Sequence, residues 1–232
     1  MAKLRATLAW RKEFQVDRIV ACTQKNNGSN DDPEFAKIMD QELSVGKIYA
    51  RGYDRDGRVL LYMRGDREQT HHPVKNMRHL VWNLEKAIAC TKRKSKQLGT
   101  SAVGLEKMIL IHDFTNFSLA SAPPMSVSKQ TMTILQSHYP ERFKTIYCFN
   151  APFMFKVFWG MVKPFVNQAT KDMIVFVNTD SAAGMTKFHQ IFDDTSGLEE
   201  VTGGTAVDKL APWDAQAYRS LPFDVAFDEK QE

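Results

Sequence analysis

The chain has 232 residues, of which 43% are hydrophobic and 25% are charged. This composition is ordinary for a globular protein and excludes global disorder. The length allows one substantial domain plus a small extension, with room for a cavity as well as a core. The net charge of +4 suits an anionic membrane surface or a nucleic acid but selects neither.

The three cysteines, Cys22, Cys90 and Cys148, are scattered and lack metal-ligand spacing. Their odd number favours a reducing compartment, and we expect all three to be buried. The N-terminal stretch MAKLRATLAWRKEF interleaves charged and apolar residues and lacks the apolar core of a signal peptide. No apolar run reaches the roughly 20 residues of a membrane-spanning helix. The sequence therefore predicts a cytoplasmic protein.

The first third of the chain contains two helical patterns and a hairpin. Residues 1–21 have apolar side chains at loosely helical spacing, and residues 23–34 then predict a loop. Two β-rich runs flank Asp56-Gly57, a dipeptide that is favoured in tight turns, and predict a hairpin over Lys47–Arg64. Apolar residues then recur every three or four positions and predict an amphipathic helix from Val74 to about Arg93.

Beyond Gly104, strand-like and helix-like segments alternate. The predicted elements are a strand at 107–114, a helix at 126–138, a strand at 145–149, an apolar helix, a strand at 173–177 and a short helix at 185–192. Strands that are apolar on both faces and separated by helices predict a largely parallel sheet with covering helices. The fold class is therefore α/β. The tail from Ala206 has no clear periodicity.

Enzyme and metal motifs are missing from the sequence. GYDRDGRV has the outer spacing of a phosphate-binding loop, but Arg58-Val59 stands where lysine and a hydroxyl residue are needed. His71, His72 and His79 lack an evident third metal ligand, and we interpret them as surface histidines. We therefore predict a protein that is not an enzyme and that uses no cofactor and no metal.

One dipeptide leaves an enzyme as an alternative interpretation. His112-Asp113 ends a strand, and the carboxyl ends of strands are where α/β sites gather. No nucleophile accompanies the pair, so we interpret Asp113 as a residue that fixes the following loop.

The segment from Phe153 to Val166 is apolar on almost every side of a helix but is too short to span a bilayer. Pro152 suits the first turn and Asn150 is placed to cap it, whereas Pro164 should end or kink the helix after about three turns. The helix is either buried in protein on all sides, or its second apolar face contacts a lipid or a membrane surface. Periodicity leaves both readings open.

The surrounding motifs resemble a known family. SHYPERFKTIYCFNAPFMFKVFWGMVKPFVNQATKDMIVFV is similar, in the order and spacing of four motifs, to the signature segment of the CRAL-TRIO (Sec14-like) lipid-binding domains. GKIYARGYDRDGR resembles the entry hairpin of the family, ILIHDF its strand ending in Asp, and GLEEVTGGT a variant of its closing segment. The resemblance implies that residues 1–30 are the remainder of a helical region, that 31–205 form the lipid-binding domain and that 206–232 form a C-terminal tail.

The resemblance implies an α/β fold whose sheet is the floor of an apolar pocket, with a gating helix at about residues 152–166 that moves at membranes. The implied lipid-binding residues are Phe114, Phe117, Glu141, Phe149, Phe155, Phe158, Trp159, Val162 and Met173. The implied gate residues are Phe153, Met154, Val157, Met161 and Phe165. The expected partners are a phospholipid or another hydrophobic small molecule and, transiently, a membrane. We expect a monomer that does not bind nucleic acid.

The sequence departs from the phosphatidylinositol-exchanging members of the family. Glu141 of the Pro-Glu-Arg motif is present, but Met173 stands where those members have a headgroup-binding lysine, and Lys171 lies two residues earlier. Met108 and Leu110 replace the hydroxyl residues of members that hold phosphatidylcholine. The resemblance therefore implies a more apolar pocket, suited to a sterol, a tocopherol-like ligand or phospholipids held by their tails. The alternative is a module of the same fold that has lost its ligand and binds a protein partner.

Overall fold

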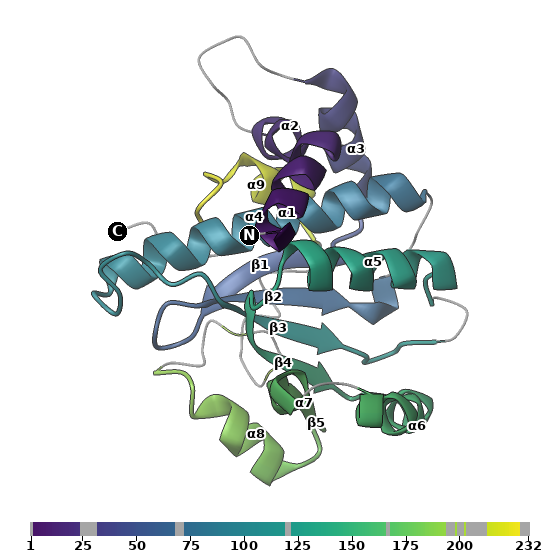
Figure 1. Ribbon diagram of the computed structural model, residues 1–232. Helices are drawn as coiled ribbons and strands as arrows, with labels where there is room; N and C mark the ends of the chain where they lie inside the picture. The colour runs from purple at the N-terminus through teal and green to yellow at the C-terminus, as the bar shows by residue number, and fades with distance from the viewer. Residues whose placement is uncertain are drawn as a thin grey trace.

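A computed structural model describes residues 2–23, 32–67, 72–118, 122–165, 168–193, 198, 202 and 213–227. Within this part of the chain, one five-stranded sheet is flanked by helices (Figure 1). The helices are α1 (Ala2–Glu13), α2 (Val16–Ala21), α3 (Pro33–Leu43), α4 (Pro73–Gln97), α5 (Met125–His138), α6 (Phe153–Val162), α7 (Gln168–Met173), α8 (Ala182–His189) and α9 (Ala215–Ser220). Short 3₁₀ turns are η1 (Gly65–Arg67) and η3 (Lys163–Phe165).

The strands follow one another in space in their chain order. They are β1 (Ile48–Tyr53), β2 (Val59–Arg64), β3 (Met108–Asp113), β4 (Phe143–Phe149) and β5 (Ile174–Val177). β1 and β2 are antiparallel, and every later pair is parallel. The predicted α/β class is thus confirmed. Figure 1 shows the N-terminal helices near the β1 edge of the sheet and α6, α7 and α8 near the β5 edge.

Side chains of α8 define one face of the sheet. The ring of Phe188 lies edge-on to Tyr147 at 4.8 Å and to Phe149 at 5.1 Å between centroids. Tyr147 is paired in register with Ile111, and Thr145 with Ile109, so these residues also point to that face. We call it the α8 face.

The opposite face carries a second set of apolar residues. Leu110 is paired with Ile146, and His112 with Cys148, so their side chains point away from α8. Phe155 of α6 packs on this side of the sheet, in one apolar cluster with Cys148. We call this side of the sheet the α6 face.

The predicted hairpin is confirmed, but its turn is longer than a two-residue loop. Asp54 and Arg58 close the turn through the Asp54 N–H, which donates to the Arg58 carbonyl at 2.9 Å. Gly57 has a φ of +84°, and a Cβ there would lie 2.7 Å from the backbone nitrogen of Ser95. Asp56 is not in the left-handed region. Gly57 is therefore required both by its own backbone and by the close approach of α4.

Three helix boundaries differ from the prediction. α3 begins at Pro33, where a loop was predicted, because Asp32 caps it by accepting a hydrogen bond from the Phe35 N–H at 3.3 Å. α4 continues to Gln97, and Arg93 in its last turns donates to the Asp224 carbonyl at 2.7 Å. α8 occupies 182–189 rather than 185–192, with Ser181 accepting from Gly184 N–H as its cap.

The segment 213–227, for which the sequence predicts no element, covers the open edge of β1. The buried hydroxyl of Tyr218 accepts a hydrogen bond from the Ala50 N–H at 2.8 Å and donates to Asn83 at 3.1 Å. The Phe227 N–H donates to the Ala50 carbonyl at 2.9 Å. These bonds satisfy backbone groups that an edge strand would otherwise expose.

Buried polar residues complete the core. His79 is fully buried in α4, so its interpretation as a surface histidine is wrong, whereas His72 is exposed and His71 lies outside the described residues. His79 faces the interior because it lies on the apolar face of α4 with Leu80 and Asn76.

Cys22, Cys90 and Cys148 are free and buried, as predicted.

Candidate functional site

The start of α6 is fixed by Asn150, although not as a helix cap. Pro152 occupies the N-cap position, and the helix begins at Phe153. The Asn150 carboxamide donates to Thr115 Oγ1 at 2.8 Å and accepts from the Thr179 N–H at 3.0 Å. The predicted capping role of Asn150 is therefore wrong. Its side chain instead joins the turns that follow β3 and β5, and its φ of +51° reverses the chain ahead of α6.

The end of α6 follows the prediction. Regular helix stops at Val162, and Lys163–Phe165 continue as a 3₁₀ turn, because Pro164 lacks the N–H that the next α-helical bond would need. Figure 1 shows α6 beyond the carboxyl ends of the strands and apart from α4 and α5.

Large apolar side chains on α6 are exposed. Phe153 is 79% and Met161 is 63% exposed, and Met154 and Val157 also face solvent. The structure therefore contradicts the interpretation that this helix is buried in protein on all sides. At about 25 cal/mol per Å² of apolar surface, such exposure is unfavourable in water, and exposed apolar patches are typical of interaction surfaces.

The inner side of α6 rests on an aromatic cluster at the carboxyl end of β3. The Phe155 ring lies 4.7 Å from Phe114 and 6.2 Å from Phe176, and Phe117 lies edge-on to Phe114 at 5.7 Å between centroids. Cys148 and Ala151 are buried in the same cluster. Removal from water raises the pKa of the Cys148 thiol to about 12, so this thiol is uncharged at neutral pH.

The cluster has a partly exposed apolar floor. Ile146, Ile174 and Phe176 on the α6 face are only partly buried, and so is Phe155 above them. Met108 and Leu110 are buried on the same face. The α6 face is thus apolar along β3, β4 and β5.

His112 belongs to this apolar surface rather than to a catalytic pair. Its ring stacks on Phe114 at 4.1 Å, and burial lowers its pKa to about 4. Asp113 points to the other face, where its carboxylate lies 3.1 Å from Arg64 Nε and accepts the Thr115 N–H at 2.8 Å. Asp113 therefore fixes the loop after β3, as predicted, and the two side chains cannot act on one substrate atom.

The structure brings together some of the predicted lipid-binding residues and separates others. Phe114, Phe117 and Phe155 are in contact, whereas Phe149 is buried on the α8 face against Phe188. Glu141 is exposed at the other end of β4, about 25 Å along the strand from Phe149.

The other predicted residues lie along α6 and α7. Trp159 and Met173 are partly buried, and Met173 is the last residue of α7. Phe158, Val162 and Phe165 lie outside the residues whose side chains the structure describes. His112, Cys148 and Phe176 were not predicted as site residues. Alternation along β3 would have placed His112 on the same face as Phe114, whereas Cys148 and Phe176 can be assigned to that face only once the strand register is known.

Two further properties limit what the site can be. Among the residues that the structure describes, no helix is both long enough and apolar enough to cross a membrane. Within the same ranges, no three His, Cys, Asp or Glu side chains gather as a metal site requires. The described site is an apolar surface made by a sheet face and the neighbouring helix α6, with the buried Cys148 thiol and the His112 ring at its centre.

A largely parallel sheet flanked by helices, with an apolar face beside an exposed apolar helix, defines the class of protein as α/β. A sequence model of the CRAL/TRIO domain matches residues 43–203, more than half of the chain, and the chain belongs to this family. The earlier resemblance is thereby confirmed.

Three relatives are identical to the chain at between a quarter and a third of the aligned positions. A CRAL-TRIO domain-containing protein of Schizosaccharomyces pombe is 31% identical over 170 residues, which are 73% of this chain and 14% of that protein. The phosphatidylinositol transfer protein PDR17 of Saccharomyces cerevisiae is 28% identical over 179 residues, 75% of this chain and 46% of its own length. The SEC14 cytosolic factor of Kluyveromyces lactis is 26% identical, covering 90% of this chain and 69% of that protein. The chain thus spans less than half the length of the first two relatives.

A solved structure has the same fold. The crystal structure of Sfh5 superposes with a TM-score of 0.60 and 20% sequence identity, covering 88% of this chain and 65% of the other. The relatives support a lipid-binding or lipid-transfer role for the family to which the chain belongs.

Proposed function

We propose that this protein binds a hydrophobic lipid in an enclosed pocket on the α6 face and transfers or presents it at membranes through movement of α6. The observation that carries the proposal is the exposure of Phe153, Met154 and Met161 on a helix whose opposite side, at Phe155, touches an apolar sheet face. A helix with two apolar sides can contact a bound lipid with one and a bilayer with the other.

The free energy that it costs to expose an acyl chain to water requires such an enclosure. Moving an acyl chain of 16 carbons into water would cost about 12 kcal/mol at ~0.8 kcal/mol per CH₂. A carrier must therefore surround the chain, and its cover must open in contact with the bilayer. We propose that α6 is this cover, with Asn150 holding its first turn and the 3₁₀ turn after Val162 acting as the second pivot.

The proposed ligand is held mainly by its apolar part. Met108, Leu110 and His112 point to the α6 face from β3, and a histidine with a pKa of about 4 is neutral at physiological pH. Phosphatidylinositol is the lipid named for the relative PDR17. Met173 in place of the family lysine argues against strong selection of that headgroup here, so we propose a sterol, a tocopherol-like molecule or a phospholipid selected by its tails.

No covalent chemistry is needed for this function. We propose a non-enzymatic carrier that works without a cofactor in the cytoplasm, with transient membrane contact, in keeping with the relatives named cytosolic factors. Trp159 and Met173 remain proposed lipid contacts, since α6 in another position would change what they touch. Glu141 remains a proposed contact of a headgroup, whereas Phe149 lies on the α8 face and outside the pocket proposed here.

The first test is mass spectrometry of lipids extracted from protein purified from a eukaryotic host. One dominant lipid near one molecule per chain is expected. An empty protein that also fails to take up lipids from vesicles would contradict the carrier, and the protein-binding module would then take its place.

The second test addresses α6. Met161→Ser should lower the rate of lipid transfer between vesicles at least several-fold and leave the unfolding midpoint unchanged, because Met161 is exposed to solvent in the structure. Leu98→Ser, at an exposed position after α4, is the matched control and should leave transfer unchanged. Equal transfer by both variants would contradict a membrane contact of α6.

A further inference from the structure

The exposed side of α6 carries two lysines as well as its apolar side chains. Lys156 and Lys163 are both exposed. They are seven residues apart in the sequence, which places them within roughly 20° of each other around an α-helix. The Lys163 N–H donates to the Trp159 carbonyl, so Lys163 keeps helical geometry although it is the first residue of η3. The two lysines therefore form one row along α6, which we call the lysine row.

The lysine row lies beside a row of exposed apolar side chains. Phe153, Val157 and Met161 follow one another at intervals of four residues, and all three are exposed. At about 100° per residue, the lysine row lies roughly 110° around the helix from the middle of this apolar row. Gly160 lies between the two rows, and a Cβ there would meet nothing within 4 Å. If the apolar row enters a bilayer, the lysine row is at the level of the headgroups.

No acidic residue of α6 or η3 offsets the lysine row. Residues 153–180 include three lysines and two aspartates, and both aspartates lie beyond η3. The first of them, Asp172, accepts a hydrogen bond from Gln168 within α7 at 2.6 Å. Within the part of the chain that the structure describes, neither Lys156 nor Lys163 forms an ion pair or a side-chain hydrogen bond.

The strand end next to this site adds no excess of negative charge. At the carboxyl end of β2, Arg64 pairs with Asp66 at 3.3 Å and with Asp113 at 3.1 Å. Arg67 of η1 supplies a second positive charge against these two carboxylates. The four described residues therefore carry no net charge together, and the lysine row remains the uncompensated charge of the site.

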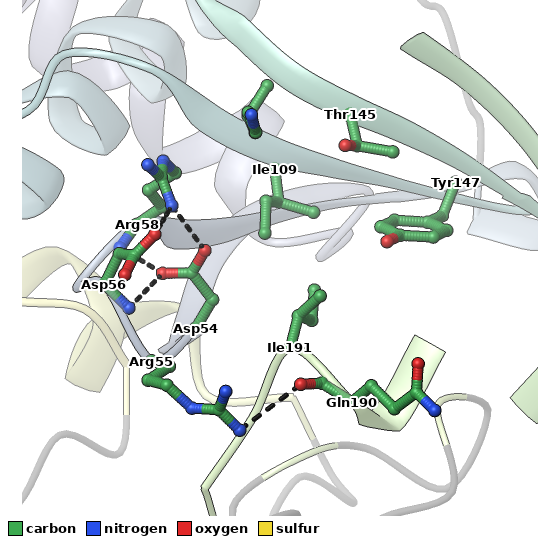
Figure 2. Close-up of a pocket in the computed structure, with 10 residues that line it drawn as sticks. Asp54, Arg55, Asp56, Arg58, Ile109, Thr145, Tyr147, Gln190 and Ile191 are labelled. Atoms are coloured by element: carbon green, nitrogen blue, oxygen red, sulfur yellow. Dashed lines mark hydrogen bonds and ion pairs between the residues drawn. The ribbon is translucent and has the colours of Figure 1, made fainter. Parts of the chain in front are cut away.

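The charged residues of the hairpin turn differ, because they pair with one another. Around a pocket of about 230 Å³ on the α8 face, Arg58 pairs with both Asp54 and Asp56 (Figure 2). Arg55 of the same turn pairs with Asp193. The cations of this turn are thus already neutralised, unlike the two lysines of α6.

A lysine row beside an apolar row fits an anionic bilayer better than a neutral one. The apolar row alone does not discriminate between headgroups, whereas each lysine near an anionic surface strengthens binding about fivefold. We propose that α6 docks on membranes rich in anionic phospholipids, with Lys156 and Lys163 contacting the anionic oxygens of the headgroups. This inference rests on the proposed contact of α6 with a bilayer and names the lipid class that the contact selects.

The test is sedimentation of the whole chain with vesicles of two compositions. One set is phosphatidylcholine alone, and the other contains about 30% phosphatidylserine, which gives the surface a negative potential. The protein should bind the anionic vesicles at least about tenfold more tightly at about 0.1 M salt, and this preference should shrink at about 1 M salt because ions screen the charges. Equal binding to both sets at the lower salt concentration would overturn the proposal.

Two variants and a matched control assign the preference to α6. Lys156→Gln and Lys163→Gln should each weaken binding to the anionic vesicles about fivefold and leave binding to phosphatidylcholine unchanged. Lys144→Gln removes an equal charge from an exposed residue, the extra residue of a β-bulge at the start of β4. This position is at the opposite end of the strand from α6, so the control should bind like the unaltered protein. An equal loss in all three variants would reflect net charge alone and overturn the docking of α6.

Lipid transfer separates this proposal from the carrier function on which it rests. Transfer between phosphatidylcholine vesicles, without any preference for the anionic set, would overturn the selection of anionic lipids and leave the carrier function intact. Failure to bind either set or to exchange lipid with it would overturn both. An acidic protein surface would then be the partner that fits the lysine row.

Discussion

The Tyr139 hydroxyl donates a 2.7 Å hydrogen bond to Glu85 Oε1 and thereby ties the junction of α5 and β4 to the middle of α4. Glu85 is held in turn by Arg11 of α1 at 2.5 Å, so three helices meet at one carboxylate. The tyrosine of the Tyr-Pro-Glu-Arg motif thus has a structural role. Its pKa is raised by burial and by the charge of Glu85.

Replacing this tyrosine tests that role. Tyr139→Phe should lower the free energy of unfolding by about 1–2 kcal/mol, because it leaves part of a partly buried carboxylate without its donor. Urea unfolding measures the loss. Lipid transfer per folded molecule should be unchanged, and a loss of transfer without a loss of stability would contradict a structural role.

A second prediction concerns Asn150. Asn150→Ala should destabilise the fold by about 2–4 kcal/mol, because it removes the bonds to Thr115 and Thr179 and places alanine in the left-handed region. Asn150→Gly is the matched variant, since glycine accepts this backbone at little cost. The difference between the unfolding free energies of the two variants measures the cost of the left-handed backbone at residue 150. Equal unfolding free energies would contradict such a cost.

A third prediction is a pH dependence set by His112. Its pKa is about 4 in the folded protein, below the usual value near 6.5, so between these values the unfolded state binds more protons. Stability should therefore fall as the pH is lowered from about 6.5 to 4, by up to about 3 kcal/mol. His112→Phe should reduce this dependence of the unfolding free energy on pH. His79 is also buried with a lowered pKa, and it should account for a further part of the dependence. A His112 imidazole that titrates near pH 6.5 by NMR would refute this expectation.

The fourth prediction uses Cys148 as a reporter of α6 movement. Its thiol is buried beneath Phe155 and has a raised pKa, so a maleimide reagent should label it slowly in solution. Contact with phospholipid vesicles should speed labelling of Cys148 but not of Cys22 or Cys90, which lie in the main core. Peptide mass spectrometry distinguishes the three sites. An equal increase at all of them would indicate general unfolding.

Much of the fold could be predicted because local signals were strong. The hairpin around Gly57, the apolar strands and the end of α6 at Pro164 each depend on a residue type whose backbone preference is pronounced. α9 was missed because six residues with one buried side chain, Tyr218, give no periodicity. His79 was misplaced because its neighbours His71 and His72 suggested a polar surface.

The candidate site was harder to predict than the fold. Whether Phe149 or Cys148 faces α6 depends on strand register, and a one-residue shift such as the bulge at Lys144 exchanges the two faces. The role of Asn150 depends on Thr115 and Thr179, which are distant in sequence and reach it only once three strands are aligned. Such contacts leave no local pattern.

The closure of the β1 edge has a consequence for folding during synthesis. Ala50 and Tyr218 are separated by 168 positions along the chain, so the ribosome adds all five strands and the helices between them before the outer edge of β1 is covered. Contacts of such high sequence separation form late and slowly. Until then β1 offers an unpaired strand edge to other chains, and the nascent protein is most vulnerable to aggregation just before residues 213–227 emerge.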